Sequence, residues 1–290
     1  MAKTQTVLVT GATSGIGREV ALHLARLGHR VLATGRKTDL LAELEAEADE
    51  LKLETFTLDV TDAASIDAAR DEVERRTEGY GLDVLVNNAG FGTMAPMERI
   101  TDEDMRRQFE TNVFGLVAVT QAFLPAMRAR GAGKVINISS VMGRITLPLQ
   151  GIYNATKHAV EALTDALRQE VRSFGIRVAL VEPGTIRSNF EATAARQADK
   201  YREMDPAYVD PIDAYAKVVA SSYRKSPGPR CIARTVARIV RIKRPRPRYV
   251  SPAFNLLAVW LIHAMPTRLV DWILRRVMHL IPAKMLPRPK

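Results

Sequence analysis

Apolar residues in the first 185 positions occur in short consecutive runs that alternate with longer segments of helical spacing. The runs are rich in Val, Ile, Leu and Thr, and they lie at residues 6–10, 31–34, 55–58, 83–86, 134–139 and 176–181. Strands whose apolar residues are consecutive, rather than alternate, are buried on both faces, as in a parallel sheet covered by helices. The repeated order of strand, helix and strand therefore predicts a parallel α/β sheet.

The segments between these runs predict helices near residues 16–27, 39–50, 63–77, 102–129 and 153–173. Apolar positions recur at helical intervals in the last two of them: Leu116, Val119 and Phe123, and then Leu163, Leu167 and Val171. A further stripe predicts a helix ahead of a last strand near residues 248–252; it consists of Ile232, Val236, Ile239 and Val240. We therefore expect a Rossmann-like, doubly wound parallel sheet of about seven strands with helices on both faces.

The region after the sixth run divides into three parts. Residues 185–211 are polar and irregular, with Pro206 and Pro211, and we interpret them as a mobile segment without a core of its own. The chain then returns to the α/β pattern, so residues 1–250 are expected to form one domain. Residues 251–290 form a C-terminal helical extension.

The extension predicts two short amphipathic helices. Its longest nearly uncharged run, Phe254–Met265, is too short to cross a bilayer, which takes about 20 residues, and Pro266 then ends the helix. Basic residues flank the two helices: Arg268, Arg275, Arg276 and Lys284. This pattern suits a helix pair lying in a membrane interface. A lid over the substrate cleft and a contact between subunits fit it equally well.

Charge is distributed unevenly along the chain. The net charge is +10, yet residues 1–200 hold 24 Lys and Arg against 27 Asp and Glu, whereas residues 201–290 hold 18 against 5. The last third therefore suits an acidic surface, either phospholipid headgroups or nucleic acid. Residues 230–248 carry eight basic and no acidic residues, but the apolar stripe within them favours a helix packed on the sheet, so we disfavour nucleic acid.

A single cysteine, Cys231, excludes an internal disulfide, and the first residues contain no apolar segment of signal-peptide length. We therefore expect a reducing, cytoplasmic setting, with contact to a membrane surface through the extension.

A glycine-rich turn, TGATSGIG at residues 10–17, lies between the first strand and the first helix. Glycines there allow the backbone to approach a pyrophosphate, which the N-terminus of the following helix stabilises. The second strand ends in Gly35, Arg36 and Lys37, where an acidic residue would hydrogen-bond the ribose of NAD. Two cations at this place favour a 2′-phosphate, so we predict NADP(H).

Tyr153 and Lys157 are four residues apart on a predicted helix and share one face. An ammonium beside a phenol favours the phenolate, which lowers a pKa that is otherwise about 10. A phenol of this kind exchanges a proton with a substrate near neutral pH. The pair alone is also compatible with ordinary packing.

Six motifs in one order resemble the short-chain dehydrogenase/reductase family over about residues 5–190. They are LDV at 58–60, NNAG at 87–90, Asn112, ISS at 138–140, YNATK at 153–157 and PG at 183–184. The resemblance implies that Tyr153 is the catalytic acid or base, that Lys157 tunes it and binds ribose, that Ser140 polarises the substrate carbonyl, and that Asn112 holds a water. Ser140 lies 13 residues before Tyr153, the family's usual interval.

The resemblance and the glycine-rich turn together imply the cofactor-binding set. It comprises Gly11, Thr13, Ser14, Gly15, Ile16, Gly17, Arg36, Lys37, Asp59, Val60, Asn88, Ala89, Gly90, Tyr153, Lys157, Pro183, Gly184 and Thr185. A helix-capping role is an alternative for Asp59. No metal site is expected.

The resemblance places the family's substrate lid at about residues 186–215, so residues 1–250 are expected to be a dinucleotide-binding catalytic domain that includes this lid. The extension resembles that of the family's hydroxysteroid and retinol dehydrogenase-like members. We therefore predict an NADPH-dependent carbonyl reductase, or the reverse alcohol dehydrogenase, that acts on a bulky apolar substrate such as a steroid, a retinoid or a long-chain acyl compound. Residues 92–97, 141–149 and Phe190 are expected to line the pocket. The alternatives are a 3-ketoacyl-thioester reductase and a non-catalytic dinucleotide sensor. By resemblance, the helices near 102–129 and 153–173 are expected to form a homodimer or homotetramer.

Overall fold

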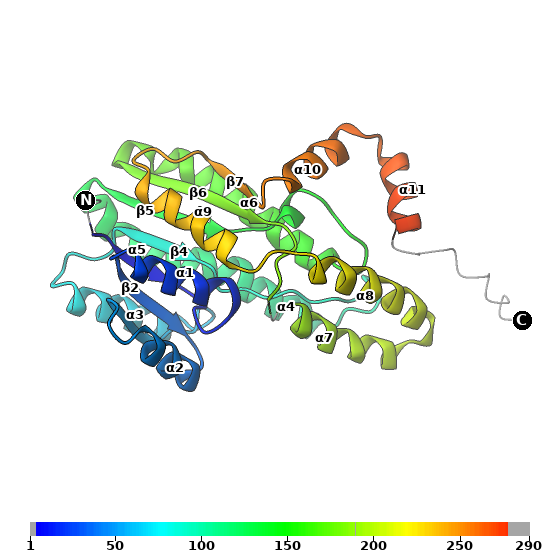
Figure 1. The fold of residues 1–290 in the computed structure, drawn as a ribbon, viewed down its shortest axis with the longest axis horizontal. Coiled ribbons are helices and arrows are strands. Elements are labelled where there is room, and N and C mark those ends of the chain that lie inside the picture. Colours follow the sequence, from blue (N-terminus) through cyan, green and yellow to red (C-terminus); the bar gives the residue numbers. More distant parts are fainter. Residues whose placement is uncertain (1–3, 189, 278–290) are drawn as a thin grey trace, which may run out of the picture.

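Within residues 4–188 and 190–277, which the computed structural model describes, seven strands form one sheet in the order β3-β2-β1-β4-β5-β6-β7 (Figure 1). Every neighbouring pair is parallel. The strands are β1 Thr6–Val9, β2 Arg30–Gly35, β3 Leu53–Thr57, β4 Val84–Asn87, β5 Gly133–Ile138, β6 Ile176–Pro183 and β7 Arg248–Ser251. The predicted seven-stranded parallel sheet is confirmed.

Helices connect the strands and continue past the last of them. The α-helices are α1 Gly15–Arg26, α2 Thr38–Ala48, α3 Ala63–Arg76, α4 Asp102–Phe109, α5 Gly115–Arg130, α6 Gly151–Glu170, α7 Phe190–Met204, α8 Val209–Arg224, α9 Arg230–Arg241, α10 Asn255–Ala264 and α11 Thr267–Val277. A π-helical turn, η1 Glu110–Phe114, joins α4 to α5, and short 3-10 turns lie at η2 Val141–Gly143, η3 Arg172–Phe174 and η4 Pro206–Tyr208.

The two faces of the sheet are buried under different helices. Val7 and Val9 of β1 face a core shared with α1, α2 and α9, whereas Leu8 between them faces the core under α3 and α5. Successive side chains of the strand point to opposite faces of the sheet, and both faces are buried. Both sets of side chains are therefore apolar, and the run shows no polar face in the sequence. All four residues of the stripe in α9 are fully buried, so the predicted packing of that helix on the sheet is confirmed.

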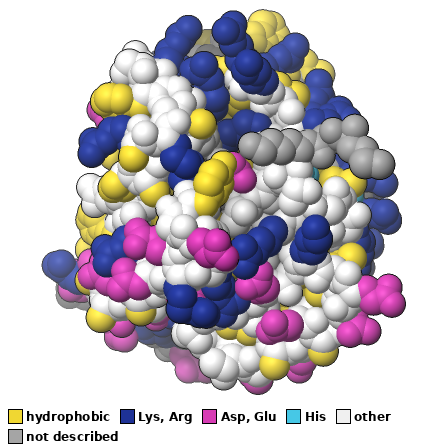
Figure 2. Space-filling view, turned by 90° about the vertical axis from the view of Figure 1, so that its left-hand side faces the viewer, with side chains coloured by type: hydrophobic (Ala, Val, Ile, Leu, Met, Phe, Trp, Pro, Cys, Tyr) yellow, Lys and Arg dark blue, Asp and Glu magenta, His cyan; other side chains and the backbone are white. Residues whose placement is uncertain are grey.

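Acidic side chains are unevenly distributed on the surface. Figure 2 shows Asp and Glu mainly in the lower part of one end of the molecule, with Lys and Arg among them, whereas the upper part shows Lys and Arg with few acidic side chains. In Figure 1 the lower part of that end is formed by α2 and α3, which belong to the acidic first two thirds of the chain.

The prediction of an irregular segment without a core of its own at residues 185–211, within the expected lid, was wrong. The segment is helical, and α8 continues to Arg224. Its helices build a small core of their own against the loops that precede α4 and α6, with Ala198, Tyr201, Ile212 and Tyr215 at most 1% exposed. The two prolines that suggested irregularity occupy first turns, where proline is tolerated because its missing N–H has no partner in the helix.

The C-terminal extension projects from the body of the molecule beyond β7 (Figure 1). As predicted, a break at Pro266 separates its two helices. Large apolar side chains on them face solvent, including Phe254 at 70% exposure and Trp260 at 64%. In the part of the chain that the structure describes, no helix is long and apolar enough to cross a membrane. Lys284 lies outside the described residues.

We expect the small core of the lid to contribute measurably to stability. Ile212→Ala removes a fully buried side chain and should lower the free energy of unfolding by about 2 to 5 kcal/mol, measured by urea denaturation. Lys217→Ala, at an exposed position of the same helix, is the matched control and should change it by about 0.5 kcal/mol or less. A loss at Ile212 as small as that of the control would contradict a packed lid.

Candidate active site

The glycine-rich turn lies at the carboxyl end of β1, where the strand order reverses between β1 and β4. Gly11 and Gly15 have φ of +65° and +56°, which side chains other than glycine rarely adopt. A Cβ on Gly17 would lie 2.3 Å from the carbonyl oxygen of Gly11. The turn therefore brings its backbone closer to α1 than any other residue would allow.

The N-terminus of α1 has backbone N–H groups available for a ligand. Ser14 occupies the N-cap position, but its side chain forms no capping hydrogen bond, and the first turn contains no acidic residue. Free N–H groups and the helix dipole together favour an anion. Residues of this turn thus fit the pyrophosphate of a dinucleotide.

Asn88 ties the glycine-rich turn to the end of β4. Its Nδ2 donates to the carbonyl oxygens of Thr10 at 2.9 Å and Gly11 at 3.1 Å. In return, Oγ1 of Thr10 accepts from the backbone N–H groups of Asn88 and Ala89, each at 3.0 Å. Thr10 was not among the predicted site residues, although a hydroxyl directly after a buried strand is a recognisable signal.

Arg36 extends into solvent at the end of β2, with 69% of its side chain exposed and Nη1 3.8 Å from Oδ2 of Asp59. Asp59 does not cap the next helix, so that alternative was wrong: Asp62 caps α3 by accepting from Ala64, while Asp59 accepts from Thr61. Arg36 therefore lies beside Asp59, another residue of the predicted cofactor-binding set, with most of its side chain accessible to an anion, and Lys37 follows it at the N-cap of α2.

The candidate catalytic residues converge at the carboxyl ends of β5 and β6. Ser140 and Tyr153 are each 7% exposed, and their hydroxyls are hydrogen-bonded to each other. Oγ of Ser140 also accepts from the backbone N–H of Met142 at 3.1 Å. Nζ of Lys157, which is also 7% exposed, donates to the carbonyl oxygen of Ile138 at 2.9 Å.

The pKa of Tyr153 is shifted opposite to the prediction. Burial raises it to about 12, and the hydrogen bond from Ser140 opposes this only in part. Lys157 does not offset burial because its ammonium is directed at the end of β5, 5.9 Å from the centre of the tyrosine ring. Burial also lowers the pKa of Lys157 to about 8, against the attraction of Glu161. The phenol is therefore protonated at neutral pH.

Asn112 lies in the π-helical turn that interrupts the predicted helix at 102–129. Its Nδ2 donates to the carbonyl oxygen of Phe91 at 2.8 Å and to Oγ1 of Thr156 at 3.1 Å, and its Oδ1 accepts from the N–H of Phe91 at 3.0 Å. The side chain is thus occupied in bracing the loop after β4 against α6. A π-turn re-aims one side chain within a helix and is frequent at functional sites.

The turn after β6 lies against both the glycine-rich turn and the extension. A Cβ on Gly15 would lie 3.6 Å from Cβ of Ser188, and one on Gly184 would lie 2.0 Å from Nδ2 of Asn255. The backbone N–H of Gly184 donates to the carbonyl oxygen of Ser251 at 2.9 Å. The segment after β6 therefore lies between the glycine-rich turn and Asn255, the first residue of α10.

Apolar residues of the loops before α4 and α6 face the lid. Leu149 adopts φ of +62°, an uncommon conformation for leucine, and its carbonyl oxygen accepts from Ala95 at 2.8 Å. Its side chain joins Met94 and Ala95 in the core of the lid. Strained residues of this kind cluster near functional sites. Phe190, the other predicted lining residue, has no described side chain.

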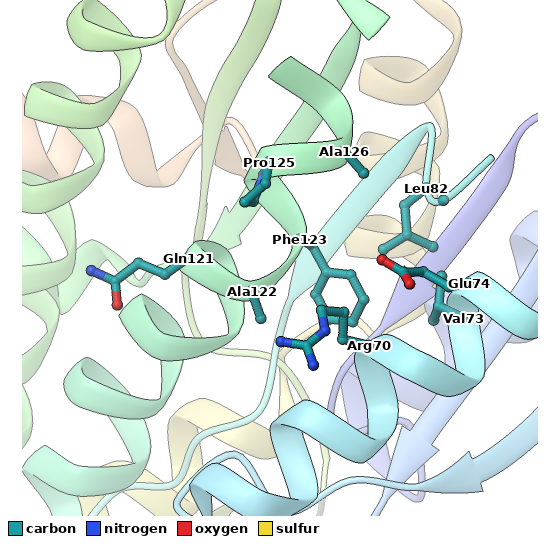
Figure 3. Close-up of a pocket in the computed structure, with 10 residues that line it drawn as sticks. Arg70, Val73, Glu74, Leu82, Gln121, Ala122, Phe123, Pro125 and Ala126 are labelled. Atoms are coloured by element: carbon teal, nitrogen blue, oxygen red, sulfur yellow. The ribbon is translucent and has the colours of Figure 1, made fainter. Parts of the chain in front are cut away.

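A surface pocket elsewhere on the protein is unrelated to this site. It lies between α3 and α5, where Figure 3 shows Arg70, Glu74 and Phe123 among its lining residues. None of its lining residues belongs to the candidate set, and it includes Gly81 and Leu82, which precede β4. It therefore lies toward the amino ends of the strands, whereas the candidate residues lie at the carboxyl ends.

The sequence analysis also missed two buried polar residues near the site. Thr156 is fully buried beside Asn112, and Glu182 is fully buried directly ahead of the PG turn. A carboxylate within the apolar run VALVEP was a signal in the sequence, whereas Thr156 carried none.

Comparison with known proteins agrees with this arrangement. The family model described as short chain dehydrogenase matches residues 5–199. A solved short-chain dehydrogenase from Streptomyces avermitilis shares 32% identity at a TM-score of 0.77, and the match covers 93% of this chain and 97% of that one.

Three relatives are similar over nearly the whole chain. The 3-ketodihydrosphingosine reductase of Bacteroides thetaiotaomicron is 35% identical, covering 93% of this chain and 97% of its own. The NADPH-dependent 3-dehydrocapnine reductase of Ornithobacterium rhinotracheale is 33% identical, with 92% and 94% covered. Human retinol dehydrogenase 5 is 34% identical, with 94% and 88% covered, which confirms the similarity to retinol dehydrogenases.

Arg36→Glu should weaken NADPH binding roughly tenfold or more relative to NADH, because it replaces a cation beside the 2′-phosphate position with an anion. Titration of the protein with each nucleotide, followed by nucleotide fluorescence, measures the ratio. Lys52→Glu, an equal charge change at an exposed position ahead of β3, is the control and should leave it unchanged. An equal ratio for both variants would place the 2′-phosphate elsewhere.

Proposed function

This chain belongs to the short-chain dehydrogenase family, and from that membership we propose that it is an NADPH-dependent reductase of a ketone carried by a bulky apolar molecule. The observation that carries the proposal is the buried hydroxyl of Tyr153. It is hydrogen-bonded to Ser140 and protonated at neutral pH, at the same edge of the sheet as the glycine-rich turn.

The residues of this edge fit NADP(H). The uncapped N-terminus of α1 suits the pyrophosphate, and Arg36 with Lys37 suits the 2′-phosphate. The remaining predicted contacts, from Asp59 to Thr185, follow the carboxyl ends of the other strands. When bound, the cofactor supplies the hydride for reduction. The NADPH-dependent relative supports this choice.

Tyr153 supplies the proton. A ketone that accepts a hydride at carbon becomes an alkoxide and takes a proton at oxygen. A phenol that stays protonated at neutral pH holds the proton that this step needs. The adjacent hydroxyl of Ser140 stabilises the developing negative charge as a second donor.

Lys157 contributes a buried positive charge beside this exchange. Its pKa of about 8 keeps it mostly protonated at neutral pH, so its ammonium, which donates to the carbonyl oxygen of Ile138, is suited to the ribose contact that the family resemblance implies. Asn112 holds the loop after β4 in place through Phe91, and the second lone pair of its Oδ1 is suited to a water.

The substrate class follows from apolar surroundings and from the relatives. Met94, Ala95 and Leu149 line the lid side, and Tyr215 closes the core behind them. Two relatives reduce 3-keto compounds by name and a third is named for retinol, so we place a long-chain lipid ketone first and a retinoid or steroid second. A 3-ketoacyl thioester remains the alternative because the basic last third suits a phosphorylated or acidic carrier.

We also propose that the extension contacts a membrane surface. Its exposed apolar residues, with Arg268, Arg275 and Arg276 between them, match an interfacial helix pair. Because Asn255 lies against Gly184, the extension begins beside the active site, where a lipid substrate would enter. The division at residue 250 and the cytoplasmic setting stay predictions.

A homodimer or homotetramer through α5 and α6 also stays a proposal. It is supported by two exposed apolar residues on these helices, Phe114 at 55% and Leu163 at 41%.

Tyr153→Phe should lower kcat for ketone reduction by about 100-fold or more, because it removes the proton donor, while NADPH binding persists. NADPH oxidation against long-chain ketones, retinaldehyde, ketosteroids and ketoacyl thioesters measures this. Tyr80→Phe, at an exposed hydroxyl bonded to Asp83, is the control. Turnover retained in Tyr153→Phe would refute the proton donor. NADPH binding without turnover of any ketone by the native protein would favour a sensor.

Replacing both Trp260 and Trp272 with Ser should reduce co-sedimentation with anionic vesicles roughly tenfold or more, because two exposed rings are lost from the apolar face. Replacing Leu27 and Phe174, which are exposed on the body, with Ser is the matched control. Equal sedimentation of both variants, together with a change in oligomer size only for the tryptophan variant, would instead identify a subunit contact.

A further inference from the structure

Two buried glutamates beneath the candidate catalytic residues have no role in the chemistry described above. Glu161 lies on α6 one turn after Lys157 and is 7% exposed, and Glu182 lies on β6 and is fully buried. Both reach the same atom, Nε of Arg248, from which Oε2 of Glu161 lies 3.0 Å away and Oε1 of Glu182 lies 3.3 Å away. The two carboxyl groups therefore lie close together.

The hydrogen bonds at this contact are incomplete. Nε of Arg248 has one hydrogen and donates it to Glu161, while another nitrogen of the same guanidinium donates to Asp165. The second oxygen of Glu182 lies 3.7 Å from Nη1 of Arg144, beyond hydrogen-bonding distance. Among the described residues, neither oxygen of Glu182 nor Oε1 of Glu161 has a hydrogen-bond partner. Buried carboxylate oxygens without donors are costly.

We propose that Glu161 and Glu182 hold one proton between them and that, through Glu161, this carboxyl pair positions the charged amine of Lys157. A single added proton supplies the O–H donor that the orphaned oxygens lack. It also relieves the repulsion of two like charges in one buried site, the arrangement in which one carboxyl group of a pair keeps its proton.

The pair is in contact with the backbone that carries the active site. A Cβ on Gly143 would lie 2.9 Å from both Cγ of Glu161 and the carbonyl oxygen of Lys157, so the turn after Ser140 packs directly on this part of α6. On the other side, the carbonyl oxygen of Pro183, next to Glu182, accepts from the hydroxyl of Ser140 at 3.4 Å. A change in the charge of the pair therefore occurs next to two candidate catalytic residues, Lys157 and Ser140.

The groups that face the pair come from every element around it. They are Lys157 and Asp165 on α6, Arg248 on β7, Arg144 after η2, and Ser139 at the end of β5. Burial, and next the charge of Glu161, raise the pKa of Glu182 to about 7, against Arg144 and Arg248. Burial likewise raises the pKa of Glu161, against Ser139 and Arg248.

The shared proton is tested without the reaction, by unfolding the protein at different pH. Glu182 has a higher pKa in the folded protein than its ordinary value of 4.5, so the native state retains a proton that the unfolded state loses. Its contribution to stability is present below pH 4.5 and is lost as pH rises to about 7. We expect Glu182→Gln to flatten the decline in stability between these values.

Glu170→Gln, at an exposed position of α6, is the matched control and should retain the wild-type decline. The pH dependence of urea unfolding of all three proteins decides the question. If Glu182→Gln declines as steeply as the wild type, the carboxyl pair holds no proton and the proposal is overturned.

The positioning of Lys157 is tested by the pH profile of kcat/KM, and this part alone rests on the proposed function. Glu161 raises the pKa of Lys157, so Glu161→Gln should move the alkaline limb of the profile, near pH 8 in the wild type, to lower pH. Glu170→Gln should leave it in place. A uniform loss of rate at every pH would indicate a structural role only and would overturn the positioning.

If the native protein reduces no ketone, the proposed function fails, while the unfolding measurement still decides whether the carboxyl pair binds a proton.

Discussion

The hydrogen bonds that join the end of β1 to the end of β4 are the interaction on which the rest of the site depends. The strand order reverses there, and the side chains of Thr10 and Asn88 exchange hydrogen bonds with each other's backbone across the gap. Parallel strands all end at one edge, so this bond sets the starting position of α1 and of the loop after β4. Asn112 continues the bracing from that loop to α6, which carries Tyr153 and Lys157.

Burial then sets the chemistry. Tyr153 and Lys157 lie in a region with little water, so their neutral forms are favoured: burial raises the pKa of the phenol and lowers the pKa of the amine. The neutral phenol is the form needed to donate a proton. The amine keeps its charge with the help of Glu161, whose own pKa is raised by burial and lowered by Ser139 and Arg248. The charge of Lys157 is thereby linked to the buried ionic cluster around Arg248.

The lid and the extension both lie beside the turn after β6. β6 ends at Pro183, Ser188 lies against Gly15, and Asn255 lies against Gly184. The helices of the lid have a packed core of their own, which an irregular segment would lack. The extension, with its exposed apolar side chains, begins beside the same turn.

The sequence alone determined the sheet, the glycine-rich turn and the order of the candidate residues, because strand burial, backbone freedom and helical spacing are local properties. Only the tertiary structure decided how those residues behave. The amine of Lys157 shares a helix face with Tyr153 but is directed at the end of β5, and burial rather than that neighbour sets the pKa of the phenol. Glu161 and Glu182 are 21 positions apart and come together through Arg248, on a third element. Contacts between distant segments, and the removal of water that accompanies them, have no signature in a local pattern.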